Sequence, residues 1–436
     1  MSMFASALLV ASAVAGVLAL LGCVQAAAGA LAFARYRRSV TRARWVAGGM
    51  AAGPGRADGP FADVLLPPAS VLKPLHGDEP LLEEALLGFI TQDYPCAQIV
   101  FGVQRSTDPA VEVVRRLCRR FPDRDLCLVI DSTQHGPNRK IGNLINMLPH
   151  ARHDLLVISD SDIHVAPDYL RQVALTFARD ERVGLVTTLY QGIPASPSLS
   201  RRFAADQINH SFLPGVLMSR LLGRQDCLGS TMALRRETLD RIGGLPMLLP
   251  HVADDSVLGS LVRDLGLHIA IAPTLTATTV AEGGPAALYA HELRWGRTVR
   301  AVEPLGYAAS AVQFPLFWAA VAAAASGLAP WSLLLLGVTW AVRAGAAASI
   351  DRLTRGIGRQ GRPSPALPVL LLPLRDFLSA VVMAGSFSGN RVNWRGQMLR
   401  VSARRSIAAD GLPAHAISAA GDLALAHAHP PLAQGD

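Results

Sequence analysis

The amino-acid sequence predicts an α/β fold with a mostly parallel sheet and flanking helices, together with transmembrane helices toward both ends of the chain. Short apolar runs alternate with amphipathic ones over residues 69–188, and this alternation is typical of βαβ units in a parallel sheet. Long apolar runs lie on both sides of that region. Of the 436 residues, 50% are hydrophobic and 17% are charged, a balance typical of a soluble domain joined to membrane segments.

Residues 1–34 are expected to form an N-terminal transmembrane anchor. The nearly uninterrupted apolar run at 4–33 is long enough to span a bilayer with some tilt. It lacks a preceding basic region and exceeds the length of a signal-peptide core, which predicts that it is not cleaved. Arginines then gather at positions 35–44 and predict a cytoplasmic side. Residues 35–63 are expected to be a basic linker, flexible over the glycine-rich stretch 47–60.

The sheet domain is predicted over residues 64–300, on the cytoplasmic side. Its first strands are expected at 69–75, 98–103, 126–130, 155–159 and 183–188, alternating with helices at 81–90, 109–121, 141–148 and 168–179. A helix at 198–222, a strand at 229–235 and helices at 236–242 and 257–265 follow. Within residues 64–300, neither a Gly-x-Gly-x-x-Gly nor a P-loop occurs, which argues against dinucleotide oxidoreductases and P-loop ATPases.

Two pairs of carboxylates stand out within this domain. Asp160 and Asp162 follow the apolar strand at 155–159, and alternating side chains would aim both at one hard cation. Open α/β sheets bind ligands at this carboxyl edge. The alternative is a solvated turn with an acidic helix cap. Asp254 and Asp255 precede the helix at 257–265, where capping explains one aspartate but not both.

The region 301–400 is predicted to be membrane-associated. Residues 307–328 and 331–350 are candidates for spanning helices, and Arg343 inside the second is expected to face a protein interior or a polar ligand. The apolar segment 368–387 carries Arg375 and Asp376 at its centre and is followed by arginines, which favours an interfacial or re-entrant segment. Residues 401–436 are expected to be a disordered tail.

Charge and cysteine content narrow the partners and the compartment. The net charge of +8 comes largely from arginine clusters beside apolar runs, which favours an anionic membrane surface. Aromatic residues make up 6% and no basic stripe interleaves with them, so nucleic-acid binding is not expected. The 5 cysteines form no Cys-x-x-Cys pair and are expected to be free thiols in a reducing compartment.

In order and spacing, several motifs resemble the ceramide glucosyltransferase family, glycosyltransferase family 21, with its nucleotide-sugar-binding GT-A fold. Taken singly, each has an ordinary explanation as a turn, cap or interface residue. The resemblance covers residues 71–300 and a short element at 393–396. It is carried by Lys73-Pro-Leu, Asp93-Tyr-Pro, Asp108-Pro, the Asn-x-Lys-x-x-Asn-Leu element at 138–144, Asp160, Asp255 and Arg294-Trp295.

On the donor side, the resemblance implies that Asp108 contacts the uridine or ribose. Lys140 and Asn143 help line the nucleotide site, although Lys140 could equally be a surface lysine on a short helix. Asp160 takes the family's second aspartate position, and Asp162 completes a metal-binding pair. An oxygen-only site of this kind suits Mg²⁺ or Mn²⁺.

On the acceptor side, the resemblance implies that Asp255 is the general base, that Arg294 pairs with the diphosphate, and that Trp295 packs at the acceptor entrance beside the membrane. His291 stands where the family has Gln or Arg. This departure leaves the role of position 291 open, with a packed or interfacial histidine as the ordinary explanation. It also argues against the processive polysaccharide synthases, which carry Gln-x-x-Arg-Trp.

The expected function is therefore transfer of a sugar from a UDP-sugar to a lipid hydroxyl by a multi-pass membrane enzyme. Within the family, the run at 229–235 and the Ala/Arg-rich style most resemble bacterial enzymes of hopanoid biosynthesis, which transfer N-acetylglucosamine to bacteriohopanetetrol. Transfer of glucose from UDP-glucose to ceramide is an alternative. Two further alternatives are a processive polysaccharide synthase, which needs more spanning helices, and a non-enzymatic membrane scaffold whose aspartates are helix caps.

Overall fold

The computed structural model describes residues 2–51, 66–355, 368–394, 397–401 and 407–409. The chain folds into two compact units, here named the sheet unit (63–188, 225–274 and 391–436) and the helical unit (1–62, 189–224 and 275–390). The expected continuous domain at 64–300 is therefore interrupted. Residues 189–224 and 275–300 belong to the helical unit because their apolar side chains pack with C-terminal helices, as Phe203 and Leu288 do with Leu372.

The strands follow the predicted order, with two differences in length and two additions. They are β1 (Ala69–Pro74), β2 (Ala97–Val103), β3 (Asp125–Ile130), β4 (Leu155–Ile158), β5 (Ile163–His164), β6 (Val183–Pro194), β7 (Met232–Arg235) and β8 (His268–Val280). β6 is longer than expected and β7 is shorter. Neither β5 nor β8 was predicted from the sequence. Within the described residues, these strands form one sheet in the order β3-β2-β1-β4-β7-β6-β8-β5.

The predicted mostly parallel sheet is confirmed around β1 and corrected at β7. β1 pairs in parallel with β2 and β4, and β2 pairs in parallel with β3. β7 instead pairs antiparallel with both β4 and β6. The apolar periodicity that predicts a strand does not encode the direction in which it enters a sheet, so the mixed character of the sheet appears only in the structure.

Alternating strand residues divide the core of the sheet unit between the two faces of the sheet. Val71 and Val157 pack with α2 (Leu82–Ile90), α3 (Pro109–Arg120) and α5 (Tyr169–Arg179). Leu72 and Ile158 pack on the other side with α4 (Arg139–Met147), α8 (Arg236–Arg241), α9 (Asp254–Asp264) and the short turns η1 (Leu148–His150) and η3 (Leu245–Leu248). A strand buried on both faces carries no polar alternation, which explains the unbroken apolar run at 155–158.

The helical unit begins with α1 (Ser2–Ala51), a single helix of 50 residues. The helix continues through the first part of the expected linker at 35–63, and residues 52–63 lie outside the described residues. The expected long helix at 198–222 is α6 (Leu199–Gln207), a π-helical turn η2 (Ile208–Phe212) and α7 (Leu213–Leu221). The remaining helices are α10 (Pro285–Val302), α11 (Pro304–Ala309), η4 (Ser310–Gln313), α12 (Pro315–Ala325), α13 (Pro330–Thr354), η6 (Val369–Leu371) and α14 (Leu372–Ser386).

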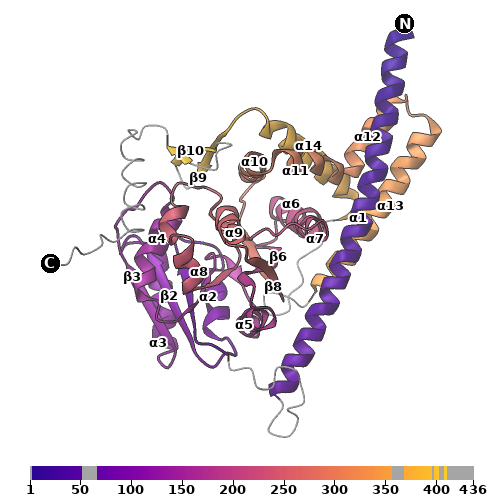
Figure 1. Ribbon diagram of the computed structural model, residues 1–436. Helices are drawn as coiled ribbons and strands as arrows, with labels where there is room; N and C mark the ends of the chain where they lie inside the picture. Colours follow the sequence, from indigo (N-terminus) through magenta and orange to yellow (C-terminus); the bar gives the residue numbers. More distant parts are fainter. Residues whose placement is uncertain (1, 52–65, 356–367, 395–396, 402–406, 410–436) are drawn as a thin grey trace, which may run out of the picture. The chain divides into compact units, whose positions relative to one another are not determined.

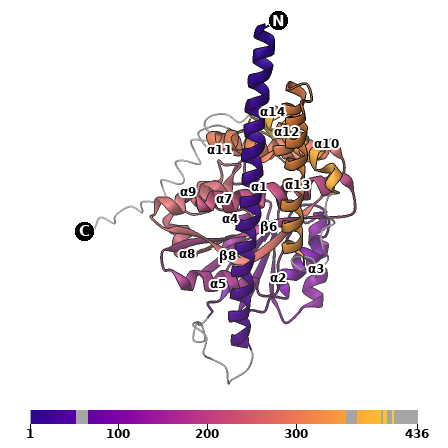
Figure 2. The same ribbon diagram turned by 90° about the vertical axis from the view of Figure 1, so that its right-hand side faces the viewer.

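Close helix packing in this unit depends on glycines of α1, which lies beside α12 and α13 (Figures 1 and 2). A Cβ at Gly22 would lie 2.3 Å from the carbonyl oxygen of Val312, and one at Gly29 would lie 2.8 Å from Cβ of Pro214. Small residues let helix backbones approach closely in membrane proteins. These two positions therefore require glycine for steric reasons.

In the described residues, three helices are long and apolar enough to cross a membrane, namely Met3–Ala43, Pro330–Thr354 and Val369–Ser386. The first two agree with the predicted anchor and with the span at 331–350. The third coincides with the segment expected to be interfacial or re-entrant, and it has the length and apolarity of a span. The predicted span at 307–328 is not a continuous helix, because Pro304–Gln313 and Pro315–Ala325 meet at a bend of 68°.

Near the end of the described chain, β9 (Arg391–Trp394), β10 (Gln397–Val401) and β11 (Ile407–Ala409) form a small antiparallel sheet. The family-like element at 393–396 begins in β9, and its residues 395 and 396 lie outside the described residues. The tail expected at 401–436 begins inside β10, and most of it likewise lies outside the described residues.

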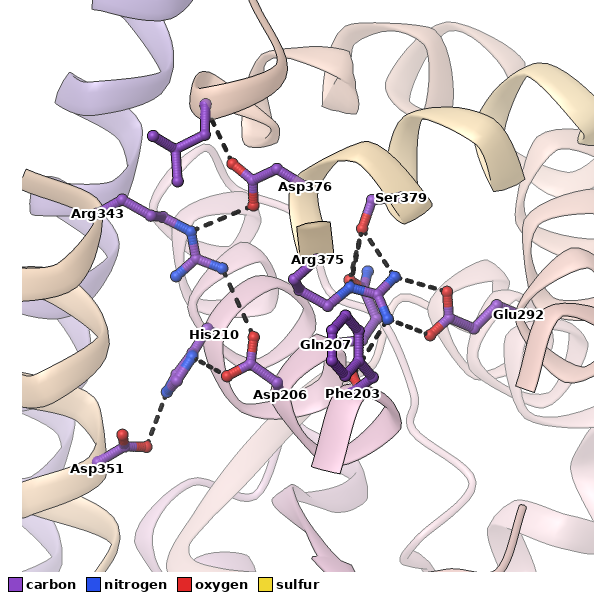
Figure 3. Close-up of polar contacts among 11 residues, drawn as sticks. Phe203, Asp206, Gln207, His210, Glu292, Arg343, Asp351, Arg375, Asp376 and Ser379 are labelled. Atoms are coloured by element: carbon purple, nitrogen blue, oxygen red, sulfur yellow. Dashed lines mark hydrogen bonds and ion pairs between the residues drawn. The ribbon is translucent and has the colours of Figure 1, made fainter. Parts of the chain in front are cut away.

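The arginines inside the membrane-type helices are buried against carboxylates of the helical unit, as predicted for Arg343 (Figure 3). Arg343 is 3% exposed and lies 3.5 Å from Asp376 and 3.8 Å from Asp206. Arg375 is 1% exposed and makes a bidentate pair with Glu292, at 2.8 and 2.7 Å. Buried charges persist in a low-dielectric interior when they are paired, so these contacts tie α6, α10, α13 and α14 together.

Candidate active site

Two of the predicted aspartates converge at the carboxyl end of the sheet unit's central strands. Asp160 lies in the turn between β4 and β5, and Asp255 lies in the first turn of α9. A Cβ placed on Gly229 would lie 3.4 Å from Oδ2 of Asp160 and 3.4 Å from Oδ2 of Asp255. The backbone N–H of Gly229 also donates to Oδ2 of Asp255 at 3.1 Å. Residues distant in sequence thus bring two carboxylates to one backbone position.

Lys140 lies between two of the carboxylates and is not a surface lysine. Its Nζ is 2.8 Å from Oδ1 of Asp160 and 3.0 Å from Oδ2 of Asp254, and its side chain is 15% exposed. Burial opposes the charge on this ammonium group, but Asp160 and Asp254 together raise the pKa of Lys140. Asp254 is therefore the ion-pair partner of Lys140. This contact gives a reason for the second aspartate of the pair, which helix capping could not explain.

Asp255 is held by backbone donors and not as a helix cap. The residue at the cap position of α9 is Ala253, with no side-chain capping bond, so the expected cap is wrong. Oδ1 of Asp255 accepts from the N–H of Ser256 at 2.7 Å. Burial, followed by the charge of Asp254, raises the pKa of Asp255 to about 6. A carboxylate with a pKa close to neutrality can accept a proton efficiently near pH 7.

Lys73 is a further charged residue of this site that the sequence analysis did not single out for chemistry. Its side chain is fully buried, and its Nζ donates to the backbone carbonyl of Asp160 and lies 3.4 Å from Oγ of Ser159. The ammonium group also lies 4.0 Å from the ring centroid of Phe89. Burial lowers the pKa of Lys73 to about 7, although Asp162 and Asp160 act in the opposite direction. The signal in the sequence that could have identified Lys73 is the presence of a lysine within the otherwise apolar strand at 69–75.

The expected metal pair lies in a turn and not along a strand. β4 ends at Ile158, so the period-two argument does not orient Asp160 and Asp162. Among the described residues, no group of three or more His, Cys, Asp or Glu side chains is arranged to hold a metal ion. The oxygen-only pair nevertheless fits Mg²⁺ or Mn²⁺, because such ions are commonly held by one or two carboxylates together with substrate phosphates and waters.

Asp108 and Asn143 are both placed by contacts with neighbouring strands and helices. Oδ1 of Asp108 caps α3 by accepting from the N–H of Ala110 at 2.9 Å, and both carboxylate oxygens lie 3.0 Å from the N–H of Gly77. Nδ2 of Asn143 donates to the carbonyl of Gly102 at the end of β2, at 2.8 Å. Asn143 is only 3% exposed, so its amide supports the end of β2 from within the core.

Arg294 and Trp295 lie on α10, which belongs to the helical unit. The Trp295 ring lies 6.2 Å from Phe212 and 5.2 Å from His291, measured between ring centroids. His291 contacts Arg294 on the same helix and also Glu282, which precedes the helix. The structure thus groups these motif residues with each other, in a different unit from the carboxylates.

The chain matches the family model described as glycosyl transferase family 21 over residues 21–407. It is 29% identical over 214 residues to ceramide glucosyltransferase 1 of Caenorhabditis elegans, covering 48% of this chain and 45% of that protein. It is 28% identical over 215 residues to ceramide glucosyltransferase 3 of the same organism, again covering 48% and 45%. The chain spans about half the length of these curated relatives.

Among solved structures, one similar chain is a mannosyltransferase from Pyrobaculum calidifontis in complex with GDP-Man and Mn²⁺. The TM-score is 0.46 and the sequence identity is 22%, with 85% of this chain and 98% of that chain covered.

Proposed function

The chain belongs to glycosyl transferase family 21, and on that premise we propose that it is a membrane-bound, inverting glycosyltransferase that moves a sugar from a UDP-sugar to a lipid hydroxyl. The observation that carries this proposal is the convergence of Asp160 and Asp255 on Gly229, with Lys140 bound to Asp160. Because Asp160 and Asp255 have different partners, one carboxylate can bind the donor while the other accepts a proton. The apolar helices of the helical unit support action on a lipid.

Asp160 and Asp162 are assigned to a Mg²⁺ or Mn²⁺ ion. When bound, such an ion neutralises the negative charge that develops on a diphosphate leaving group. Lys140 holds Oδ1 of Asp160 at 2.8 Å, which orients that carboxylate, and its own positive charge adds to the field at the leaving group. Asp108 and Asn143 are assigned to the uridine side, because they follow or support the end of β2.

Asp255 is assigned the role of general base. As the acceptor hydroxyl oxygen attacks the anomeric carbon, its proton passes to the Asp255 carboxylate and the bond from that carbon to the diphosphate oxygen breaks. UDP leaves from the opposite face, so the configuration at the anomeric carbon is inverted. The N–H of Gly229, at 3.1 Å from Oδ2, fixes the carboxylate in position for this transfer.

Arg294 and Trp295 are assigned to the diphosphate and to the acceptor entrance. A guanidinium group can contact a diphosphate through two parallel N–H donors. An indole ring suits the boundary between a polar site and a lipid phase.

The donor and acceptor proposed are UDP-N-acetylglucosamine and bacteriohopanetetrol, in the inner membrane of a bacterium with the sheet unit in the cytoplasm. This choice rests on the resemblance of the run at 229–235 to hopanoid-pathway enzymes and on arginines that flank the apolar segments. Glucosylation of ceramide is the second candidate, because the curated relatives described above are ceramide glucosyltransferases.

The decisive experiment incubates the purified full chain, in lipid nanodiscs, with each of UDP-N-acetylglucosamine and UDP-glucose. Each donor is paired with bacteriohopanetetrol or ceramide, and products are identified by mass spectrometry. We expect one N-acetylglucosamine per bacteriohopanetetrol, dependent on Mg²⁺ or Mn²⁺ and abolished by EDTA. Glucosylceramide as the product would select the second candidate, and longer sugar chains would indicate a processive synthase. No consumption of either donor would contradict the enzymatic proposal.

A further inference from the structure

A chain of three side chains links the loop after β8 to the arginine of α10. Glu282 lies between the end of β8 at Val280 and the start of α10 at Pro285. Its Oε1 contacts Nδ1 of His291, in the second turn of the helix. On the other side of the imidazole ring, Nε2 lies 3.4 Å from Nη2 of Arg294. The spacing of three residues between His291 and Arg294 places both on one helix face.

The partners of His291 determine its tautomer. A guanidinium group carries only donors, so Nε2 must accept from Arg294. In its neutral form, imidazole has one donor and one acceptor nitrogen, and the proton of that form then lies on Nδ1, which donates to Glu282. A carboxylate is the stronger acceptor for this proton, and it therefore fixes the tautomer that Arg294 requires.

Burial supports a fixed arrangement around this chain. The Glu282 side chain is 9% exposed, compared with 37% for His291, so the buried carboxylate anchors a more accessible ring. Burial opposes ionisation of Glu282, but the hydrogen bond from His291 lowers the pKa of Glu282. The Trp295 ring packs against the same imidazole in a T-shaped arrangement, with an interplanar angle of 72°. Two neighbours thus restrict the rotation of the ring.

We propose that Glu282 and His291 are positioning residues that hold the guanidinium of Arg294, the group assigned above to the donor diphosphate, in one orientation. The proposal rests on the role of Arg294 given above and adds a reason for the histidine in this chain. Glutamine could serve at the same position, because its amide presents an acceptor oxygen whatever Glu282 does. A histidine presents an acceptor at Nε2 only when its proton is held on Nδ1.

The test is a double-mutant cycle on the full chain in nanodiscs, with sugar transfer measured as kcat and KM for the donor. We expect Glu282→Gln and His291→Ala each to lower kcat/KM roughly tenfold, the lower end of the cost of losing a partner that orients a histidine. His291→Gln should stay within about threefold of the parent, since one hydrogen bond is exchanged for another. In the His291→Gln background, Glu282→Gln should cause no further loss.

Glu303→Gln is the matched control. Glu303 follows the last residue of the same helix and pairs with Arg224 at 3.1 Å, where its side chain is 40% exposed. This change should leave kcat/KM unaltered, because an exposed ion pair contributes little. Thermal unfolding of each variant, followed with and without UDP and Mn²⁺, distinguishes a misfolded variant from one in which only the orientation of Arg294 is lost.

Two results would overturn the proposal. Equal losses from Glu282→Gln in the parent and in the His291→Gln background would assign Glu282 a role independent of the histidine tautomer. Full activity of both Glu282→Gln and His291→Ala, together with an inactive Arg294→Ala, would refute the positioning role while leaving the role of Arg294 intact. If Arg294→Ala itself transfers sugar normally, the assignment of Arg294 fails, and the positioning proposal fails with it.

Discussion

The sheet unit and the helical unit each hold a cluster of charged side chains, and the charges of the two clusters are paired differently. In the helical unit, Arg375 is matched by both oxygens of Glu292, and Arg343 lies between two carboxylates. In the sheet unit, Lys140 pairs with Asp160 and Asp254, while Asp255 accepts from backbone N–H groups. The paired charges of the helical unit are expected to keep their ionisation states, because each one lies against an opposite charge. A carboxylate whose pKa is raised by burial and by a neighbouring carboxylate, as that of Asp255 is, is suited to exchange a proton.

We therefore expect substitutions in one cluster to affect mainly activity and substitutions in the other to affect mainly stability. Removing a charge from the sheet unit's cluster should affect turnover with little effect on folding. Removing a charge from the helical unit's network should affect folding first. Four substitutions test the contrast, in order of decreasing effect.

Asp255→Asn should give the largest effect on turnover. The amide preserves size but can accept from only one of the two backbone N–H groups that Asp255 accepts from. It cannot accept the hydroxyl proton, so kcat should fall by about 10²–10⁴. UDP binding in the presence of Mn²⁺ should be retained, because the base acts on the acceptor in the transition state. Calorimetric UDP binding and single-turnover transfer measure the two properties separately.

The matched control is Asp264→Asn, at the far end of α9 and exposed, which should transfer sugar at the parent rate. A near-parental rate in Asp255→Asn would move the base to another carboxylate, with Asp254 as the first to examine.

Arg375→Met should give the largest loss of stability. It leaves Glu292 buried without its bidentate partner, and breaking a buried ion pair costs about 3–5 kcal/mol. The double variant Arg375→Met with Glu292→Leu should recover much of this loss, because an apolar pair removes the uncompensated charge. Denaturant or thermal unfolding in nanodiscs provides the measurement. If the single variant is as stable as the parent, the network does not hold these helices together.

His210 should make the stability of the helical unit dependent on pH. Its two ring nitrogens face Asp206 and Asp351, and Arg343 lies beside Asp206. Burial opposes the charge, but Asp206 and Asp351 raise the pKa of His210 to about 9. Because this folded-state pKa lies above the unfolded value of about 6.5, the protonated ring contributes stability that is complete below about pH 6.5 and is lost as the pH rises through 9.

The thermal unfolding temperature of the parent should therefore fall between pH 7 and pH 9.5, by the equivalent of up to roughly 3 kcal/mol. His210→Gln should be less stable at pH 7 and should show a flatter dependence over this range. The same slope in both proteins would assign the pH dependence to a different group.

Glu83→Gln should have the smallest effect of the four substitutions on both stability and turnover. Glu83 pairs with Arg116 at 2.8 Å on the surface of the sheet unit, where both side chains are close to half exposed. Exposed pairs contribute about 0–1 kcal/mol, so neither the unfolding temperature nor kcat should change appreciably. A loss comparable to that of Arg375→Met would show that burial does not separate the two kinds of ion pair.

The amino-acid sequence by itself determined the elements whose signal is local. The apolar runs at 69–75 and 155–159 predicted β1 and β4 to within about a residue, because a strand buried on both faces needs no information from elsewhere in the chain. The anchor and the span at 331–350 followed from apolar length alone. The candidate aspartates were found by their order and their position after predicted strands, and their chemical roles remain proposals.

Only the tertiary structure decided which charges meet. Lys140 and Asp254 are more than 100 residues apart, and the buried position of Lys73 depends on contacts with β2, β4 and α2. The antiparallel direction of β7, the bend before α12 and the contact of Glu282 with His291 are likewise products of packing. Sequence periodicity reports which face of an element is apolar. The partner of a buried charge depends on which distant segments the fold brings together. At this site, that is why Lys140 is not a surface lysine but pairs with the two carboxylates of Asp160 and Asp254.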